Sequence, residues 1–127
     1  MKFLKFTFVM TVMVIGLNSC QKDDEPKSVA GTWEGKWGYY TETPSNYEKW
    51  DMEEGGDLSV VYQDGTLYAV GSWDQDGGEI EVHYTVLDET YSYTFKGTYD
   101  EDDDEITGNW TNDNLPIVEG TFVMQRQ

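Results

Sequence analysis

Apolar and polar residues alternate along most of this chain with a period of two, which is typical of β-strands that bury one face. In Tyr91–Tyr99, rings or glycine occupy every odd position and Ser, Thr or Lys every even one. The helical period of about 3.6 residues is almost absent. The pattern predicts eight strands, at Thr32–Tyr40, Tyr47–Met52, Leu58–Gln63, Thr66–Trp73, Glu79–Leu87, Tyr91–Tyr99, Glu105–Thr111 and Val118–Arg126.

Short turn signals separate these strands. Asp64-Gly65 is a two-residue hairpin signal, and Asp76-Gly77-Gly78 and the acidic run 100–104 mark further hairpin tips. Connections this short favour pairing between consecutive strands. We therefore expect an all-β domain over residues 31–127, a small eight-stranded antiparallel up-and-down barrel.

A glycine two residues before an aromatic ring recurs six times, as in Gly71-Ser72-Trp73 and Gly108-Asn109-Trp110. Residues two apart in a strand share a face. Glycine lets a strand coil tightly while a neighbouring ring covers the gap, so the motif favours a barrel over a sandwich. The predicted inward face comprises Trp33, Trp37, Tyr39, Leu58, Val60, Tyr62, Leu67, Trp73, Ile80, Val82, Tyr84, Tyr91, Tyr93, Phe95, Tyr99, Ile106, Trp110, Phe122 and Met124.

All five tryptophans and nine tyrosines fall within this domain. Buried tyrosine hydroxyls need polar partners, so a tyrosine-rich interior indicates either a pocket or a filled core whose hydroxyls reach the rim. Eight strands enclose just enough room for side chains or one small ligand. The candidate ligand-binding residues are Trp37, Tyr62, Trp73, Tyr84, Tyr91, Tyr93 and Trp110.

The first residues have the plan of a secretory signal peptide: Lys2 and Lys5, then an apolar run that ends at Leu17. That run is shorter than the roughly 18 residues that span a membrane. Leu17-Asn18-Ser19-Cys20 resembles the lipobox of bacterial lipoproteins, which implies cleavage after residue 19 and lipid attachment at Cys20. Residues 20–30 would then be the lipidated cysteine and a polar linker. Cys20 is the only cysteine, so no disulfide is expected.

The residues after Cys20 bear on location. Gln21 stands where an aspartate would imply retention in the inner membrane, so the resemblance implies an outer-membrane lipoprotein anchored by its lipid. The segment 22–25 resembles an acidic export tag for the cell surface; the alternative is a solvated linker.

The formal net charge is −17, which excludes nucleic-acid binding because that needs a basic footprint. His83, the only histidine, is predicted to face outward, and no nucleophile motif is present, so we predict neither enzyme activity nor a cofactor. Asp100, Asp102 and Asp104 could offer oxygens to a cation, but they lack the EF-hand pattern and are expected to form a solvated hairpin tip.

Gly31-Thr32-Trp33 at the start of the first strand, with Arg126 in the last, resembles the lipocalin (calycin) pattern. That resemblance implies that Arg126 packs over the ring of Trp33 where the barrel closes. The domain is shorter than typical lipocalins and lacks the family disulfide. Gly108–Asp113 is also similar to the opening strand of avidin-type biotin binders, but lies near the wrong end of the chain.

Two functions follow as hypotheses. The first is non-enzymatic binding of a small apolar or aromatic molecule inside the barrel of a lipid-anchored envelope protein. The alternative is a surface module for protein interaction or inhibition, with a solid core and with Tyr40, Trp50 and Tyr68 exposed on its outside. An enclosed apolar pocket distinguishes the first from the second.

Overall fold

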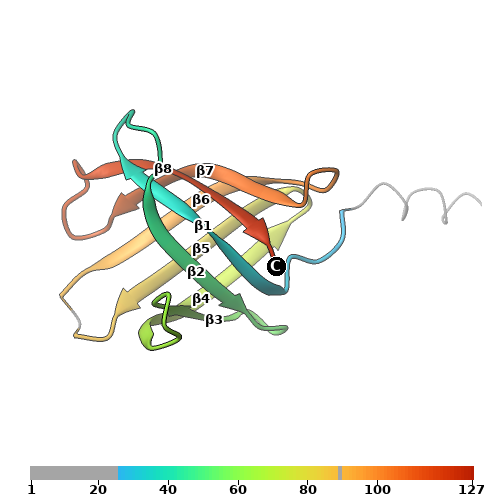
Figure 1. The fold of residues 1–127 in the computed structure, drawn as a ribbon, viewed down its shortest axis with the longest axis horizontal. Helices are drawn as coiled ribbons and strands as arrows, with labels where there is room; N and C mark the ends of the chain where they lie inside the picture. The colour runs from blue at the N-terminus through green and yellow to red at the C-terminus, as the bar shows by residue number, and fades with distance from the viewer. Residues whose placement is uncertain (1–25, 89) are drawn as a thin grey trace, which may run out of the picture.

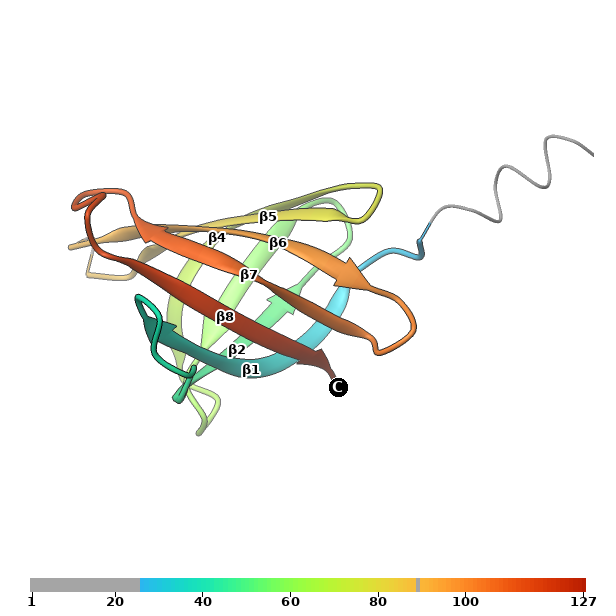
Figure 2. The same ribbon diagram turned by 90° about the horizontal axis from the view of Figure 1, so that it is seen from above.

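The computed structural model describes residues 26–88 and 90–127, which form a closed barrel of eight antiparallel strands in sequential order (Figure 1). β1 also pairs with β8, and this pairing closes the sheet (Figure 2). The predicted fold class is therefore confirmed. The strands are β1 (Gly31–Tyr39), β2 (Asn46–Met52), β3 (Asp57–Val61), β4 (Leu67–Asp76), β5 (Glu79–Val86), β6 (Ser92–Asp100), β7 (Glu105–Asn112) and β8 (Glu119–Arg126).

The predicted leader, residues 1–19, and Cys20 lie outside the described residues. Within the described part of the chain, no helix has the length and apolar character needed to cross a bilayer.

Glycines sit where neighbouring strands come closest. A Cβ added at Gly71 would lie 1.9 Å from the carbonyl oxygen of His83, and one at Gly120 would lie 1.8 Å from that of Gly38. The cross-strand partner of Gly71 is Tyr84, and that of Gly120 on β7 is Trp110. Rings thus cover bare backbone, the arrangement that the recurring glycine–aromatic motif predicts.

The two ends of the barrel differ. One end, here called the closed end, holds the start of β1 and the end of β8, and the first described residues lie against it (Figure 1). The opposite end, here called the mouth, carries the β1–β2, β3–β4, β5–β6 and β7–β8 loops. Most inward residues near the closed end and the middle are buried, but Tyr39, Tyr62, Leu67 and Tyr91 are each more than a third exposed.

These four exposures correct the predicted core. Tyr39, Tyr62 and Tyr91 lie at the rim of the mouth, where no further layer of protein covers them. The exposure of Leu67 follows from a β-bulge: the register of β3 and β4 shifts between Val60 and Val61, so that Leu67 pairs with Val61 and is 41% exposed. A bulge of this kind re-aims the side chains that follow it.

Trp50 was expected on the outside in the interaction-module hypothesis, and that expectation is wrong. Its side chain is completely buried, whereas Tyr40 is 51% exposed. The inward positions of β2 are Glu48, Trp50 and Met52, all three of which are buried. The charged residue at the first of these positions hides the alternation that would have placed Trp50 inside.

At the closed end, the guanidinium carbon of Arg126 lies 4.7 Å from the centroid of the Trp33 ring, the contact that the sequence resemblance implies. Arg126 also donates to Asp104 Oδ1 at 2.9 Å and to the carbonyl oxygens of Ser28 and Ala30, each at 3.0 Å. The carbonyl of Val29, a completely buried residue, accepts from Trp33 Nε1 at 2.8 Å. Packing onto the barrel therefore begins before Gly31, within the expected linker.

Candidate functional site

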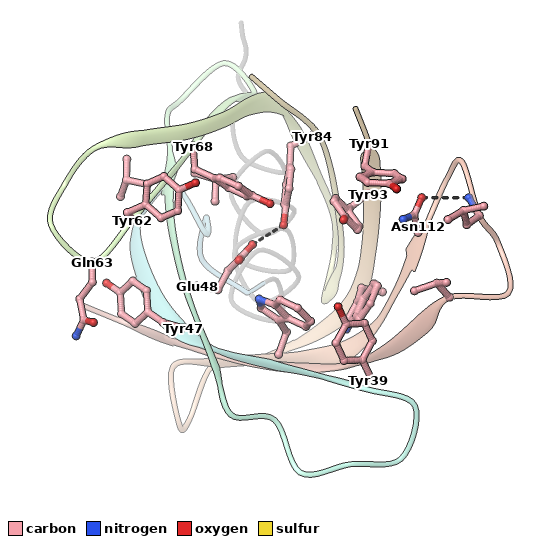
Figure 3. A pocket seen from close by; sticks show the side chains of 16 residues that line it. Tyr39, Tyr47, Glu48, Tyr62, Gln63, Tyr68, Tyr84, Tyr91, Tyr93 and Asn112 are labelled. Carbon is pink, nitrogen blue, oxygen red and sulfur yellow. Dashed lines mark hydrogen bonds between the residues drawn. The ribbon is translucent and has the colours of Figure 1, made fainter. Parts of the chain in front are cut away.

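A cavity of about 560 Å³ occupies the mouth half of the barrel. Seven tyrosines and two tryptophans line it, together with four aliphatic residues and three polar ones, Glu48, Gln63 and Asn112. Figure 3 shows the tyrosines around the cavity and Glu48 among them. The size and the mostly apolar lining, with a few polar groups, are those of small-molecule sites.

Three aromatic rings form the layer on the closed-end side of this cavity. The ring centroids of Trp50 and Phe95 are 5.2 Å apart, those of Phe95 and Phe122 are 5.1 Å apart, and those of Trp50 and Phe122 are 5.6 Å apart. Tyr84 stacks on Phe95 at 5.5 Å. The interior is therefore solid in its closed-end half and hollow in its mouth half.

Glu48 is the one carboxyl group among the described residues that line the cavity, and only 4% of the residue is exposed. Its Oε2 accepts two hydrogen bonds, from Trp50 Nε1 at 2.9 Å and from the Tyr84 hydroxyl at 2.7 Å (Figure 3). Across residues 26–88 and 90–127, no lysine, arginine or histidine lines the cavity and none forms a salt bridge with Glu48. A buried acid without a cationic partner is costly, which makes this position a candidate functional group.

Burial raises the pKa of Glu48 from its ordinary value to about 7, against the hydrogen bonds from Trp50 and Tyr84, which lower it. The pKa values of the tyrosines beside it are also raised, which moves them further from neutral pH. Burial raises the pKa of Tyr68 to about 12, and burial together with the negative charge of Glu48 raises the pKa of Tyr84 well above its usual range. Near neutral pH, Glu48 is therefore the titrating group of the cavity while these hydroxyls stay protonated.

The β3–β4 bulge gives the cavity an additional ring. Val60 pairs with Ala69 and Val61 with Leu67, which leaves Tyr68 without a cross-strand partner on β3. Tyr68 lines the cavity, with its ring centroid 5.0 Å from that of Tyr62. Alternation alone assigned Tyr68 to the outer surface, and the bulge is the reason that it lies inside.

The structure brings six of the seven candidate ligand-binding residues to this cavity: Trp37, Tyr62, Tyr84, Tyr91, Tyr93 and Trp110. Trp73 is the exception. It lies toward the closed end, half-buried, where its Nε1 donates to the carbonyl of Glu53 at 2.9 Å. The alternation placed Trp73 on the correct face but could not place it along the barrel axis.

Sequence reasoning missed Glu48 and Asn112. Both are polar residues at buried positions, so they interrupt the apolar pattern rather than contribute to it. Asn112 Oδ1 accepts from the backbone N–H groups of Asn114 and Leu115, and so orders the β7–β8 loop at the mouth. A signal for Glu48 was present in Glu48-Lys49-Trp50-Asp51-Met52, where the glutamate shares the face of Trp50 and Met52.

Carboxylates of the acidic hairpin tip, those of Asp100 and Asp104, are engaged by groups within the protein. Asp100 Oδ1 accepts from the backbone of Asp102 and Asp103, and Asp104 is engaged by Arg126 and Tyr99. Across residues 26–88 and 90–127, no three His, Cys, Asp or Glu side chains are grouped to hold a metal ion.

His83 lies on the exposed outer surface of β5, as predicted. Its Nδ1 is 3.0 Å from Thr94 Oγ1 and 3.2 Å from Asp113 Oδ2. This group is on the outside of the wall and does not face the cavity.

Comparisons of the chain with protein-family models, with curated proteins and with solved structures find no match.

Proposed function

We propose that this protein binds a small molecule with an aromatic or apolar body in the mouth half of its barrel. The single observation that carries the proposal is the cavity of about 560 Å³ with nine aromatic rings around it. A solid core of this sequence would leave no such space. Aromatic walls bury a flat ligand at little conformational cost, because their side chains have few rotatable bonds.

No catalytic role is part of the proposal. The cavity holds one carboxyl group and neither a histidine nor a cysteine among its lining residues. Holding a ligand needs only shape and a few polar contacts. The rival hypothesis of a protein-interaction module relied on exposed aromatic residues. Two of these are not on the outer surface, because Trp50 is buried and Tyr68 lines the cavity.

The proposal also covers the protein family and the cellular location. The contact between Arg126 and Trp33 supports a lipocalin-like barrel. The leader motif supports a lipid anchor at Cys20 in the outer membrane, with surface exposure as a further step. From Cys20 to Pro26 the chain reaches at most about 20 Å. Since the described chain joins the barrel at the closed end, this tether would leave the mouth facing away from the bilayer (Figure 1).

Titration of the purified protein with N-phenyl-1-naphthylamine, a neutral aromatic dye that brightens in apolar surroundings, tests the binding function. We expect saturable binding of one dye per barrel, weakened at least about fivefold in Tyr93→Ala, which removes a wall ring. Trp73→Phe is the matched control, because Trp73 lies outside the cavity. Binding that does not saturate, or that responds equally to both variants, would contradict the proposal.

Mass spectrometry of the protein extracted with its lipid tests the anchor. We expect an acyl-modified Cys20 as the first residue, and any compound that co-purifies would be a candidate ligand. An intact leader, or an unmodified Cys20, would overturn the proposed location without affecting the binding proposal.

A further inference from the structure

Glu48 has more hydrogen-bonding capacity than the barrel uses. Both of its protein donors, Trp50 Nε1 and the Tyr84 hydroxyl, bond to Oε2. Oε1 has no hydrogen-bond partner among the described residues, although the residue is 96% buried and lines the cavity. A buried carboxyl oxygen without a protein partner costs free energy, so a ligand that supplies a donor would relieve that cost.

The chemistry around Glu48 favours a positively charged donor. Rings of Tyr68, Tyr84 and Tyr93 come from three neighbouring strands, with centroids 6.5 Å apart for Tyr68 and Tyr84 and 5.6 Å apart for Tyr84 and Tyr93. Aromatic faces attract cations through their quadrupoles, and a set of rings with a carboxylate is a typical ammonium site. Among the cavity's lining residues no basic side chain competes for Glu48.

The charged residues around the mouth also favour a positively charged ligand. The loops around it contain no lysine or arginine, and among their acidic residues Glu42, Asp64, Asp88 and Asp113 are exposed. A formal net charge of −17 also favours the approach of cations over that of anions. An anionic ligand would have to pass this field and then desolvate beside Glu48.

We propose that the ligand of this cavity is an organic amine, an aromatic or apolar body carrying a protonated ammonium group that pairs with Glu48 Oε1 between the tyrosine rings. This inference rests on the proposed binding function and adds the ligand class. The body of the ligand lies against the aromatic walls nearer the mouth, and the ammonium end points toward the closed end.

Three matched probes test the ligand class by isothermal titration calorimetry at pH 8: 2-phenylethylamine, which is cationic, 2-phenylethanol, which is neutral, and phenylacetate, which is anionic. We expect the amine to bind at least about tenfold more tightly than the alcohol, the difference of one charge-assisted contact at a buried carboxyl group. Phenylacetate should bind at least about tenfold more weakly than the alcohol.

Glu48→Gln keeps the size of the side chain and an oxygen that can accept from Trp50 and Tyr84, but removes the charge. We expect this variant to bind the amine and the alcohol within about threefold of each other, while its affinity for the alcohol stays within about threefold of wild type. Glu81→Gln, which removes one carboxylate from the exposed face of β5, is the control for net charge and should keep the amine preference.

A second measurement needs no variant. The groups that face Glu48 are Tyr84 from β5, Tyr68 from β4 and Tyr93 from β6, and their raised pKa values keep all three neutral between pH 5.5 and pH 8. Asp88 at the rim is fully exposed and ionised throughout that range because its pKa lies below the usual value. The amine preference should therefore disappear at pH 5.5, where Glu48 is protonated.

The outcomes separate the two proposals. Equal binding of amine and alcohol by the wild type at pH 8, or an amine preference that survives in Glu48→Gln, overturns the ligand class and leaves the binding function standing. If none of 2-phenylethylamine, 2-phenylethanol and N-phenyl-1-naphthylamine binds, the binding function fails and the ligand class falls with it.

Discussion

The Tyr84 hydroxyl donates a 2.7 Å hydrogen bond to Glu48 Oε2, across the interior of the barrel from β5 to β2. Both residues are at least 96% buried, and the nearest Glu48 donor besides Tyr84 is the indole of Trp50. Two donors to one oxygen compensate only part of the cost of burying this carboxyl group. The barrel thus keeps an acid in a place where an apolar side chain would be more stable, a departure that is typical of functional positions.

Glu48→Gln should stabilise the protein, and more so at high pH. Because the pKa of Glu48 is about 7 in the folded state against an ordinary 4.5, the folded protein holds a proton that the unfolded chain has released between these values. Stability therefore falls as pH rises through this window. The stability advantage of the variant should grow by roughly 2 to 3 kcal/mol between pH 5 and pH 8, as measured by urea unfolding.

Two features make that result specific. The carboxyl groups of Asp64, Asp88 and Asp104 have pKa values below their usual range and stay ionised from pH 5 upward, so they add no slope there. Glu81→Gln on the exposed face of β5 should show no such growth. A Glu48→Gln advantage that is constant with pH would mean that the carboxyl group titrates normally.

Tyr84→Phe should raise the pKa of Glu48 further. The hydrogen bond from Tyr84 is one of two that lower this pKa against burial, and phenylalanine keeps the ring that stacks on Phe95 at 5.5 Å. We expect the midpoint to move up by about one pH unit, as followed by the carboxyl carbon shift of Glu48 in NMR. The same measurement on Tyr93→Phe, a ring without a hydrogen bond to Glu48, should leave the midpoint almost unchanged.

Much of this fold was predictable because strand alternation is a local property that survives in the sequence. The glycine–aromatic motif carried further information, since Gly71 and Gly120 meet Tyr84 and Trp110 on neighbouring strands. Position along the barrel axis was not predictable in the same way. Trp73 and Trp37 both occupy inward positions of strands in which apolar and polar residues alternate. Trp73 nevertheless lies near the closed end, whereas Trp37 lines the cavity.

The central residue of the site was not found from the sequence for a physical reason. Hydrophobicity predicts the burial of an apolar residue, but it could not predict the burial of Glu48, which is polar. Tyr68 was missed because the bulge between Val60 and Val61 changes the parity of β4, and a bulge has no sequence signal of its own here. Val29 was missed because the side chain that holds its backbone N–H, that of Gln75, lies 46 residues away along the chain.

Gly120→Ala should disrupt the barrel, whereas Gly78→Ala should not. A Cβ at Gly120 would lie 1.8 Å from the backbone oxygen of Gly38 and 2.8 Å from Trp110 Nε1, and backbone on two strands would have to move. At Gly78 the nearest atom, the oxygen of Tyr99, is 3.8 Å away. We expect Gly120→Ala to cost at least about 3 kcal/mol, or to prevent folding, and Gly78→Ala to change stability by less than about 0.5 kcal/mol in urea unfolding.

Arg126→Ala should weaken the closed end while leaving the mouth intact. The change removes the guanidinium over Trp33, the ion pair with Asp104 and the hydrogen bonds that hold Ser28 and Ala30. With about one fifth of the Arg126 side chain exposed, the ion pair is partly screened, and we expect a total loss of about 2 to 3 kcal/mol.

Arg126→Lys tests which part of that contact matters. Lysine keeps the charge but lacks the planar fork that reaches Asp104 and two carbonyls together, so most of the loss should remain. Lys96→Ala, an exposed cation on β6, controls for net charge and should change stability by less than about 0.5 kcal/mol. Hydrogen exchange at the Val29 amide, which donates to Gln75 Oε1 at 3.0 Å, should quicken in both Arg126 variants. Because the cavity lies at the other end of the barrel, affinity for N-phenyl-1-naphthylamine should stay within about twofold of wild type; a large loss of affinity would show that the closed end and the mouth do not act independently.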